Sequence, residues 1–330
     1  MNQDKNNVLT EIRKIIENAT NIALFCHIRP DGDAIGSMLG LGWSLEEMGK
    51  KVQYVCPDEL PVQGWLNPQT IGKNTRFVKA PEPYDCSILL DVSTLSRAGY
   101  FFEQPNIGQP DICIDHHVSN TGDAKINLID PSAPATAIIV AHLIEELNFP
   151  MNKEIAEALL SGIIMDTQGF STSNTNPDSL RVTAKLMEQG ADLYWGIQNI
   201  LKAHSLEAAK YWHCGLSKLE TRGKILWTVL TDTDRVHSGY TGRDDAGLID
   251  YLASTEGFLA TVLFNEQNDG RVKISWRSRP GVNVAAIAEE FGGGGHRQAA
   301  GADVNGPIDD VVERVLACTE KGVRSAEQSS

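Results

Sequence analysis

The first half of the chain alternates short apolar runs with longer amphipathic stretches, and this alternation constrains the fold more than any other feature. The runs have the length of buried strands, and the stretches between them place apolar residues at helical spacing. Strands that alternate with helices are typical of a mostly parallel sheet covered by helices. The expected strands are 22–26, 52–55, 87–90 and 112–114, and the expected helices are 8–19, 34–48, 137–147 and 153–165.

The pattern changes after the middle of the chain. Residues 181–219 are rich in Ala, Leu, Lys and Glu and contain few strand signals, which indicates helix. Beyond them, strands are expected at 224–230, 258–265 and 271–277, helices at 246–253, 283–291 and 308–318, and a loose tail at the end. The expected α/β architecture therefore has a large first domain over 1–190, a helical connector over 191–219 and a smaller α/β domain over 220–330.

Composition excludes several classes of protein. No segment approaches the ~18 consecutive apolar residues of a membrane span, and the N-terminus lacks the apolar core of a signal peptide. The six cysteines are scattered without a CxxC pair, which predicts reduced thiols in a cytoplasmic protein. The formal charge of −14 argues against binding along long nucleic acid. A small phosphorylated ligand remains possible, because a metal ion or a few arginines create a local positive site.

Histidine and aspartate residues follow the expected strands, and one expected helix, at four separate places. Ligands of α/β sheets bind beyond the carboxyl ends of the strands, so these side chains are expected to meet. Carboxylate oxygen and imidazole nitrogen together suit Mn²⁺, Mg²⁺, Zn²⁺ or Fe²⁺. The residues are His27, Asp31 and Asp33 in HIRPDGDAIGS, Asp91 after SILL, Asp115, His116 and His117 in DHH, and Asp166 after SGIIM.

Each of these pieces has a purely structural explanation when taken alone. Asp33 lies near a helix N-cap, and Asp91 or Asp166 could cap the segments that follow them. DHH could be a buried histidine pair satisfied by Asp115. These explanations must hold at four places together, so the sequence favours a metal site.

The second half carries two candidate anion-binding elements. In WRSR, the arginines could form a solvated edge or bind phosphate bidentately. Side-chain alternation places four residues on one strand face: Lys273, Ser275, Arg277 and Arg279. The tract GGGGH, residues 292–296, could offer backbone N–H groups to an anion or simply end a helix after Phe291.

The motifs HIRPDGDAIGS, LLDVS, DHH, GIIMDTQGF, WRSR and GGGGHRQAAG occur in this order, and the resemblance that they carry spans roughly residues 10–320. In this combination the chain resembles the DHH phosphoesterases that carry a DHHA1-type second domain. Within that family it is most similar to the bacterial nanoRNase type, bifunctional oligoribonucleases that also remove the 3'-phosphate of 3'-phosphoadenosine 5'-phosphate. The resemblance implies an N-terminal DHH domain and a smaller C-terminal DHHA1 domain.

The resemblance also implies a site with two divalent ions, Mn²⁺ being favoured and Mg²⁺ or Co²⁺ possible. One ion would be held by His27, Asp31 and Asp91, and the other by Asp33, Asp91, His116 and Asp166. Asp91 would bridge the ions, Asp115 would orient an imidazole, and His117 would face the substrate phosphate. The implied chemistry is attack of a metal-activated water on phosphorus.

The implied substrates are very short RNA or DNA oligonucleotides and 3'-phosphoadenosine 5'-phosphate, bound by a monomer or homodimer. The substrate's non-reacting end would contact Arg277, Arg279, Gly293, Gly294, Gly295 and His296, with Arg97 and Asn120 helping to hold phosphate. Three alternatives remain open. They are a manganese inorganic pyrophosphatase or exopolyphosphatase, a RecJ-like exonuclease, and a nucleotide-sensing module without turnover.

Overall fold

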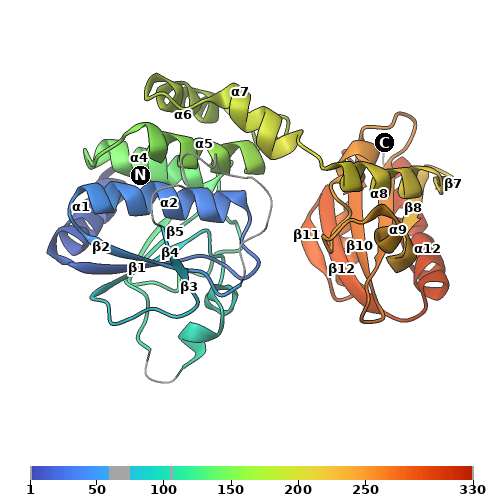
Figure 1. Cartoon of the computed structure of the whole chain (residues 1–330), viewed down its shortest axis with the longest axis horizontal. Helices are drawn as coiled ribbons and strands as arrows, with labels where there is room; N and C mark the ends of the chain where they lie inside the picture. Colours follow the sequence, from blue (N-terminus) through green and yellow to red (C-terminus); the bar gives the residue numbers. More distant parts are fainter. Residues whose placement is uncertain (1, 59–74, 105–106, 329–330) are drawn as a thin grey trace. The chain divides into compact units, whose positions relative to one another are not determined.

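The computed structural model describes residues 2–58, 75–104 and 107–328. They form two compact units, residues 1–203 (unit 1) and residues 204–330 (unit 2), each with its own sheet and core (Figure 1). Within the described residues, no helix is both long and apolar enough to cross a membrane. All six cysteines are free thiols.

Unit 1 is built on a six-stranded sheet in which every neighbouring pair is parallel. The strands are β1 (Asn21–Phe25), β2 (Lys51–Val55), β3 (Phe77–Val78), β4 (Cys86–Leu90), β5 (Ile112–Asp115) and β6 (Ile126–Ile129). Their order is β3-β2-β1-β4-β5-β6, so the chain reverses its direction of travel across the sheet between β1 and β4. The expected mostly parallel sheet is confirmed, and this reversal point is where such sheets bind ligands.

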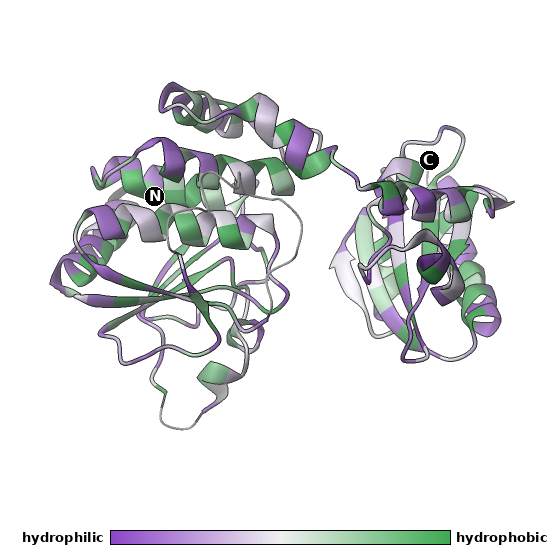
Figure 2. Cartoon of the chain, in the orientation of Figure 1, coloured by the Kyte–Doolittle hydropathy of each residue, from purple (hydrophilic) through white to green (hydrophobic). Residues whose placement is uncertain are grey.

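The two faces of the sheet are covered differently. Ile22 and Leu24 of β1 pack into the core under the long helices, whereas Ala23 and Phe25 pack on the opposite face with Phe102. The helices of unit 1 are α1 (Asn2–Asn18), α2 (Gly32–Glu47), α4 (Thr136–Glu146), α5 (Lys153–Asp166), α6 (Pro177–Glu188) and α7 (Leu193–Gly196), with 3₁₀ turns η1 (Leu95–Ala98) and η2 (Tyr100–Glu103) and the π-helical turn η3 (Ile197–Leu201). Hydrophobic residues of α2, α4 and α5 belong to the core on the first face of the sheet, and Figure 2 colours them green.

Helices α2 and α5 pack closely because glycines line their contact. A Cβ on Gly36 would lie 2.5 Å from the carbonyl oxygen of Ala158, and one on Gly32 would meet the Met165 side chain. These contacts pair the start of α2 with the end of α5, so the two helices run antiparallel. The close packing therefore brings Asp33, in the first turn of α2, beside Asp166 at the end of α5.

Unit 2 contains a second six-stranded sheet, which is antiparallel except for the β8–β9 pair. Its strands, in the order β11-β12-β10-β9-β8-β7, are β7 (Glu220–Arg222), β8 (Ile225–Leu230), β9 (Ala260–Glu266), β10 (Arg271–Ser278), β11 (Gly294–His296) and β12 (Ala299–Asn305). Its helices are α8 (Leu206–Leu216), α9 (Asp232–Ser238), α10 (Leu248–Ala253), α11 (Val284–Glu289) and α12 (Ile308–Gln328). Residues of α8 and α10 form one core cluster, and residues of α11 and α12 form the other.

Two expectations need correction. The tail over 323–330 was expected to be loose, but α12 continues past residue 318 to Gln328, because Val323 continues its buried stripe. Strand β10 ends at Ser278, so Arg279 lies outside the strand whose face it was expected to share. Several short elements were also not expected from the sequence: β3, β6, β7, β11, β12 and α9.

Candidate metal centre

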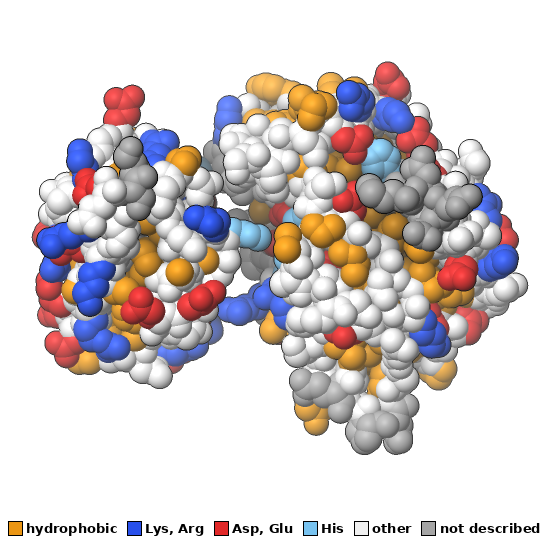
Figure 3. Space-filling view, turned by 180° about the vertical axis from the view of Figure 1, so that it is seen from behind, with side chains coloured by type: hydrophobic (Ala, Val, Ile, Leu, Met, Phe, Trp, Pro, Cys, Tyr) orange, Lys and Arg blue, Asp and Glu red, His pale blue; other side chains and the backbone are white. Residues whose placement is uncertain are grey.

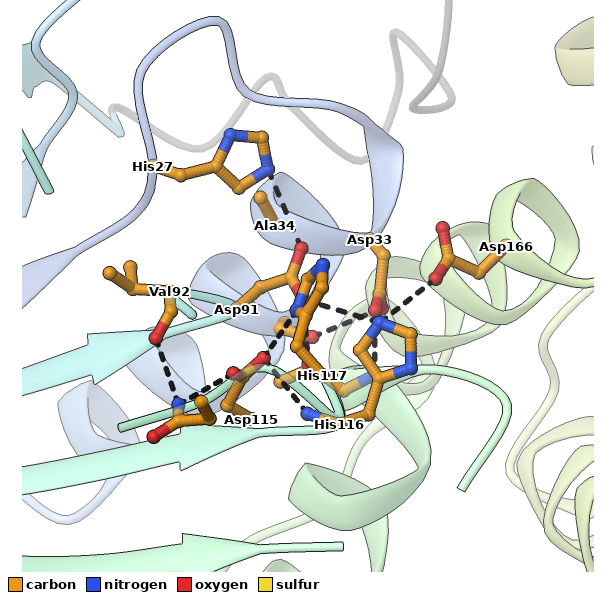
Figure 4. Close-up of polar contacts among 12 residues, drawn as sticks. His27, Asp33, Ala34, Asp91, Val92, Asp115, His116, His117 and Asp166 are labelled. Carbon is orange, nitrogen blue, oxygen red and sulfur yellow. Dashed lines mark hydrogen bonds and ion pairs between the residues drawn. The ribbon is translucent and has the colours of Figure 1, made fainter. Parts of the chain in front are cut away.

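The predicted histidines and aspartates of unit 1 converge where β1, β4 and β5 end and α2 and α5 meet (Figure 4). Three groups of side chains each place one donor atom per residue within 4.8 Å of one another. The groups are His27, Asp31 and Asp91; Asp33, His116 and Asp166; and Asp91, His116 and His117. Segments separated by more than a hundred residues thus supply one cluster.

The first group surrounds the Nε2 atom of His27, a residue that is only 4% exposed. This nitrogen lies 3.5 Å from Oδ2 of Asp91 and 3.8 Å from Oδ2 of Asp31. The Nδ1 atom lies 2.8 Å from the carbonyl oxygen of Ile28, which can only accept, so Nδ1 carries a proton. Nε2 is therefore the nitrogen available for a metal ion. Asp31 is also the N-cap of α2, accepting from the backbone N–H groups of Asp33 and Ala34.

The second group surrounds Nε2 of His116. This nitrogen lies 3.2 Å from Oδ2 of Asp166 and 3.6 Å from Oδ1 of Asp91. Its Nδ1 lies 3.2 Å from the carbonyl oxygen of Ala133, which again assigns the proton to Nδ1 and leaves Nε2 as the donor atom for a metal.

Asp91 is common to both groups and is 2% exposed. Its two oxygens face different histidines: Oδ2 faces His27, and Oδ1 faces His116. Its backbone has a φ of 60°, a left-handed conformation that is uncommon for residues other than glycine. The backbone N–H of Asp91 also donates to the carbonyl oxygen of Ile114 at 3.0 Å, which ties this turn to β5.

Asp33 is fully buried and is held by the start of α4. Its Oδ2 accepts the backbone N–H of Thr136 at 2.6 Å, and its Oδ1 accepts that of Ala137 at 2.9 Å. The N-cap of α4 is Ala135, whose side chain cannot accept a hydrogen bond. Asp33 therefore satisfies the first N–H groups of a helix 103 positions away.

Asp115 orients His117. Its Oδ1 lies 2.7 Å from Nδ1 of His117, and its Oδ2 accepts from Nδ2 of Asn120 at 2.6 Å. The same Asn120 amide donates to the carbonyl oxygen of Val92, and its Oδ1 accepts the N–H of Gly122. Both ends of the Asn120 side chain are thus used within the protein. This placement favours a role in holding Asp115 over the phosphate contact expected from the sequence.

The charges of the cluster fit a divalent cation. Burial raises the pKa of Asp33, and the neighbouring charges of Asp91 and Asp31 raise it further. Burial likewise raises the pKa of Asp166, as do the charges of Asp33 and Asp31. Burial lowers the pKa of His27, but hydrogen bonds to Asp31 and Asp91 outweigh it and raise the value to about 10. Burial and the neighbouring charges thus disfavour the ionised forms of Asp33 and Asp166, which positive ions in the cluster would stabilise.

The side chains of Arg97 and Thr136 also contact members of the metal set. Arg97 is exposed, and its Nη2 lies 3.4 Å from Nδ1 of His27, at the rim of the cluster. Thr136 is fully buried, and its hydroxyl donates to Oδ1 of Asp91 at 2.9 Å. The sequence analysis did not identify Thr136. The signal that could have found it is the weak helix start at Ala135, which has to be capped from elsewhere.

In unit 2, the two candidate phosphate-binding arginines both contact the α10 region. Nε of Arg277 donates to Oδ1 of Asp250 at 2.7 Å, and Nη1 donates to the backbone carbonyl of Trp276. Nη2 of Arg279 lies 3.4 Å from the carbonyl oxygen of Ser254, just after α10. Each guanidinium has further N–H groups beyond these bonds.

The first part of the glycine tract ends helix α11, and the second part forms strand β11. The N–H groups of Gly292 and Gly293 donate to carbonyls of α11, so these residues close that helix. Gly294, Gly295 and His296 form β11, which pairs with β12. A Cβ on Gly293 would lie 2.1 Å from the carbonyl oxygen of Gly301, and Gly295 has a φ of 142°. Glycine is therefore required at both positions by the backbone itself.

Comparisons with known proteins agree with this arrangement. The family model described as "DHH family, N-terminal domain" matches residues 21–163, and the one described as "DHHA1 domain" matches residues 223–321. The bifunctional oligoribonuclease and PAP phosphatase NrnA of Thermus thermophilus is 31% identical over 328 residues, which cover 98% of this chain and 96% of the relative. The protein of the same name from Bacillus subtilis is 25% identical over 94% of this chain and 97% of that relative.

Solved structures share the fold. An exopolyphosphatase-related protein from Bacteroides fragilis has a TM-score of 0.87 at 24% identity, with 98% of each chain covered. RecJ from Thermus thermophilus, in complex with Mn²⁺, has a TM-score of 0.53 at 14% identity, covering 98% of this chain and 54% of RecJ. At these identities the likeness concerns the fold alone.

Proposed function

Because the chain belongs to the DHH family of phosphoesterases, with an N-terminal DHH domain and a C-terminal DHHA1 domain, we propose that it hydrolyses very short oligonucleotides to mononucleotides and removes the 3'-phosphate of 3'-phosphoadenosine 5'-phosphate. We further propose that it does so with two divalent ions, most favourably Mn²⁺. The names of the relatives that cover nearly the whole chain support this choice of substrates.

The observation that carries the proposal is the position of Asp91. One of its oxygens faces His27 and the other faces His116, and each histidine has a further carboxylate beside its Nε2 atom. This arrangement supports two ion sites that share one carboxylate. One ion would be held by His27, Asp31 and Asp91, and the other by Asp33, Asp91, His116 and Asp166. When bound, the ions would supply an activated water and positive charge for the phosphoryl oxygens.

The chain's own groups account for the remaining chemistry. Asp115 accepts a hydrogen bond from Nδ1 of His117 and so leaves Nε2 to face the substrate. Burial lowers the pKa of His117, but the hydrogen bond to Asp115 and the charge of Asp91 outweigh it and raise the pKa above its ordinary value. His117 is therefore suited to stabilise a phosphoryl oxygen and to protonate the leaving oxygen. Arg97, which lies beside His27, would contact the same phosphate from the rim.

Unit 2 would hold the part of the substrate that is not hydrolysed. Arg277 is held by Asp250 but retains N–H groups for a phosphate, and Arg279 is more loosely bonded. His296 and the backbone of Gly294 and Gly295 at the edge strand β11 would complete this contact, and Gly293 would let the backbone approach β12 closely. Figure 3 shows basic side chains interspersed with acidic ones on the surface of both units, and the net charge is −14. Local arginines therefore suit a short substrate better than a long one.

A substrate comparison tests the proposal. The full chain is loaded with Mn²⁺ and incubated with RNAs of two to about ten residues, with 3'-phosphoadenosine 5'-phosphate and with inorganic pyrophosphate or polyphosphate. We expect fastest turnover of the shortest RNAs, release of phosphate from the bisphosphate, and loss of both activities on chelation. Preferential hydrolysis of pyrophosphate or polyphosphate would contradict the nucleotide assignment. Tight nucleotide binding without turnover would instead support a sensing module.

A further inference from the structure

One buried segment, residues 133–137, contacts three of the candidate metal ligands without contributing a ligand itself. The carbonyl oxygen of Ala133 accepts from Nδ1 of His116. The N–H groups of Thr136 and Ala137 donate to Asp33. The hydroxyl of Thr136 donates to Asp91. The start of α4 therefore touches ligands of both proposed ion sites.

Among these contacts, only the one with Asp91 uses a side chain of the segment, the hydroxyl of Thr136, and the others use its backbone groups. The side chain of an aspartate rotates easily about its last torsion, which is broad and roughly two-fold. A carboxylate shared by two ions must keep one oxygen directed at each. In this structure Oδ1 faces His116 and Oδ2 faces His27, and the hydroxyl of Thr136 lies 2.9 Å from Oδ1. This hydrogen bond favours the rotation of the carboxylate in which each oxygen faces a different histidine.

The position of Thr136 in its helix explains why the hydroxyl is free to do this. Within a helix, a threonine hydroxyl commonly bonds to the carbonyl oxygen one turn earlier. Thr136 is the first residue of α4, so no earlier helical turn is present to compete. Its hydroxyl proton is therefore available to Asp91. The oxygen of Asp91 that receives it still has a lone pair for an ion.

We propose that Thr136 is a positioning residue, which holds the Asp91 carboxylate in the orientation that serves both ions. The proposal rests on the proposed function only in requiring two divalent ions. It assigns to the Thr136 hydroxyl a role distinct from its backbone N–H, which holds Asp33. A change that removes the hydroxyl and keeps the backbone therefore separates the two roles.

The test compares Thr136→Val, which has nearly the same shape without the hydroxyl, with Thr136→Ser, which keeps it. Thr183→Val is the matched control, because Thr183 is a buried threonine of unit 1 whose hydroxyl has no hydrogen-bond partner among the described residues. Each metal-free full-length protein is titrated with Mn²⁺ by calorimetry. The electron paramagnetic resonance spectrum of the loaded protein then reports whether two Mn²⁺ ions are magnetically coupled.

We expect the wild type, Thr136→Ser and Thr183→Val to bind two coupled ions. In Thr136→Val, Mn²⁺ affinity should fall by about 10- to 100-fold, the range seen when partners of metal ligands are removed, and the coupled spectrum should be lost. Coupled ions bound with wild-type affinity in Thr136→Val would overturn the proposal. If Thr136→Val does not fold, as judged by circular dichroism, Thr136→Ala provides the same comparison. A wild type that binds fewer than two ions would refute the two-ion function itself, a different result from equal behaviour of variant and wild type.

Discussion

The candidate residues of the two units stand in opposite electrostatic states. In unit 1, buried carboxylates face one another, and the pKa values of Asp33 and Asp166 are raised by burial and by neighbouring carboxylates. In unit 2, Arg277 already has a carboxylate partner in Asp250, and Arg279 contacts a backbone carbonyl. In the first site, His27 offsets only part of the carboxylate charge, whereas in the second site Arg277 is paired with a carboxylate before any ligand binds.

Because of this difference, unit 1 should depend on metal ions and unit 2 should depend on the substrate. A cluster of like charges requires cations, so the properties of unit 1 should change with metal. Arg277 is already paired and keeps its position without ligand, so unit 2 should respond to the size and charge of the substrate and hardly to metal. Substitutions in unit 1 should therefore change the rate of hydrolysis, and substitutions in unit 2 should change the preference for substrate length.

The largest effect is expected in unit 1 from Asp91→Ala. Removing the shared carboxylate should reduce hydrolysis to background and abolish the binding of two Mn²⁺ ions, as measured by phosphate or nucleotide release and by metal analysis. Asp130→Ala is the control, because Asp130 follows β6 at the same edge of the sheet but belongs to none of the three groups. Undiminished turnover in a folded Asp91→Ala protein would remove the basis for a shared-ion site.

A smaller loss is expected from His117→Ala. Without an acid at the leaving oxygen, turnover should fall by about 10²-fold or more, within the range of acid–base groups, while both ions stay bound. Metal analysis of the purified variant provides the check. If one ion is missing, His117 is itself a ligand, as its place in the group with Asp91 and His116 would allow.

In unit 2, Arg279→Ala should slow dinucleotide cleavage by about 10- to 100-fold, since a hydrogen bond to a charged group contributes about 1.5–3 kcal/mol. Hydrolysis of bis-p-nitrophenyl phosphate should be unaffected, because this ester lacks a second nucleotide for unit 2 to hold. Rates on both substrates are compared with those of Arg271→Ala, whose arginine is the first residue of β10 and pairs with Asp269. Equal losses on the two substrates would mean that Arg279 serves the chemistry or the fold and not substrate length.

The smallest effect concerns protons in unit 1. In the metal-free protein the pKa of His27 is raised to about 10, so the imidazole of His27 must lose a proton before it can bind a cation. Calorimetric titration with Mn²⁺ in buffers of different ionisation enthalpy should show net proton release, and affinity should weaken as pH falls.

The raised pKa of His27 also predicts how the stability of the metal-free protein changes with pH. A group whose folded-state pKa is raised contributes stability that is complete at low pH and is lost as pH rises. For His27 this contribution is complete below its ordinary value of 6.5 and disappears as pH rises through about 10. Denaturant unfolding of the chelated protein over this interval provides the measurement. Stability that increases with pH there would contradict the assigned shift.

The convergence of the cluster could be predicted because it depends on short-range rules. An apolar run that ends in Asp91 indicates a strand with an acid at its carboxyl end, and parallel strands bring such ends to one edge. The assignment of caps was less accurate. Asp31 caps α2, whereas the sequence analysis considered Asp33 for this position, and the carboxylate of Asp33 accepts from another helix. The residue types indicated that carboxylates lie near a helix N-terminus, but they did not indicate which helix each carboxylate caps.

Contacts between distant segments could not be predicted in this way. Thr136 lies in PSAPAT, where nothing local marks a partner for Asp91, which is 45 positions away. Asp250 likewise gives no local sign that it holds Arg277. The helical tail was a different kind of error, because Val315, Thr319 and Val323 continue the four-residue spacing of α12 that the polar composition obscured.

The cap that α4 receives from Asp33 has a consequence for how the protein folds. An isolated helix start without its own cap is costly to nucleate, and Ala135 offers none. The first turn of α4 should therefore become stable only when α2 has docked, a contact that closes a loop of 103 residues. Hydrogen exchange should then report α4's first turn and the surroundings of Asp33 opening together. We therefore expect the first turn of α4 and the placement of Asp33 beside the other candidate metal ligands to form in one step.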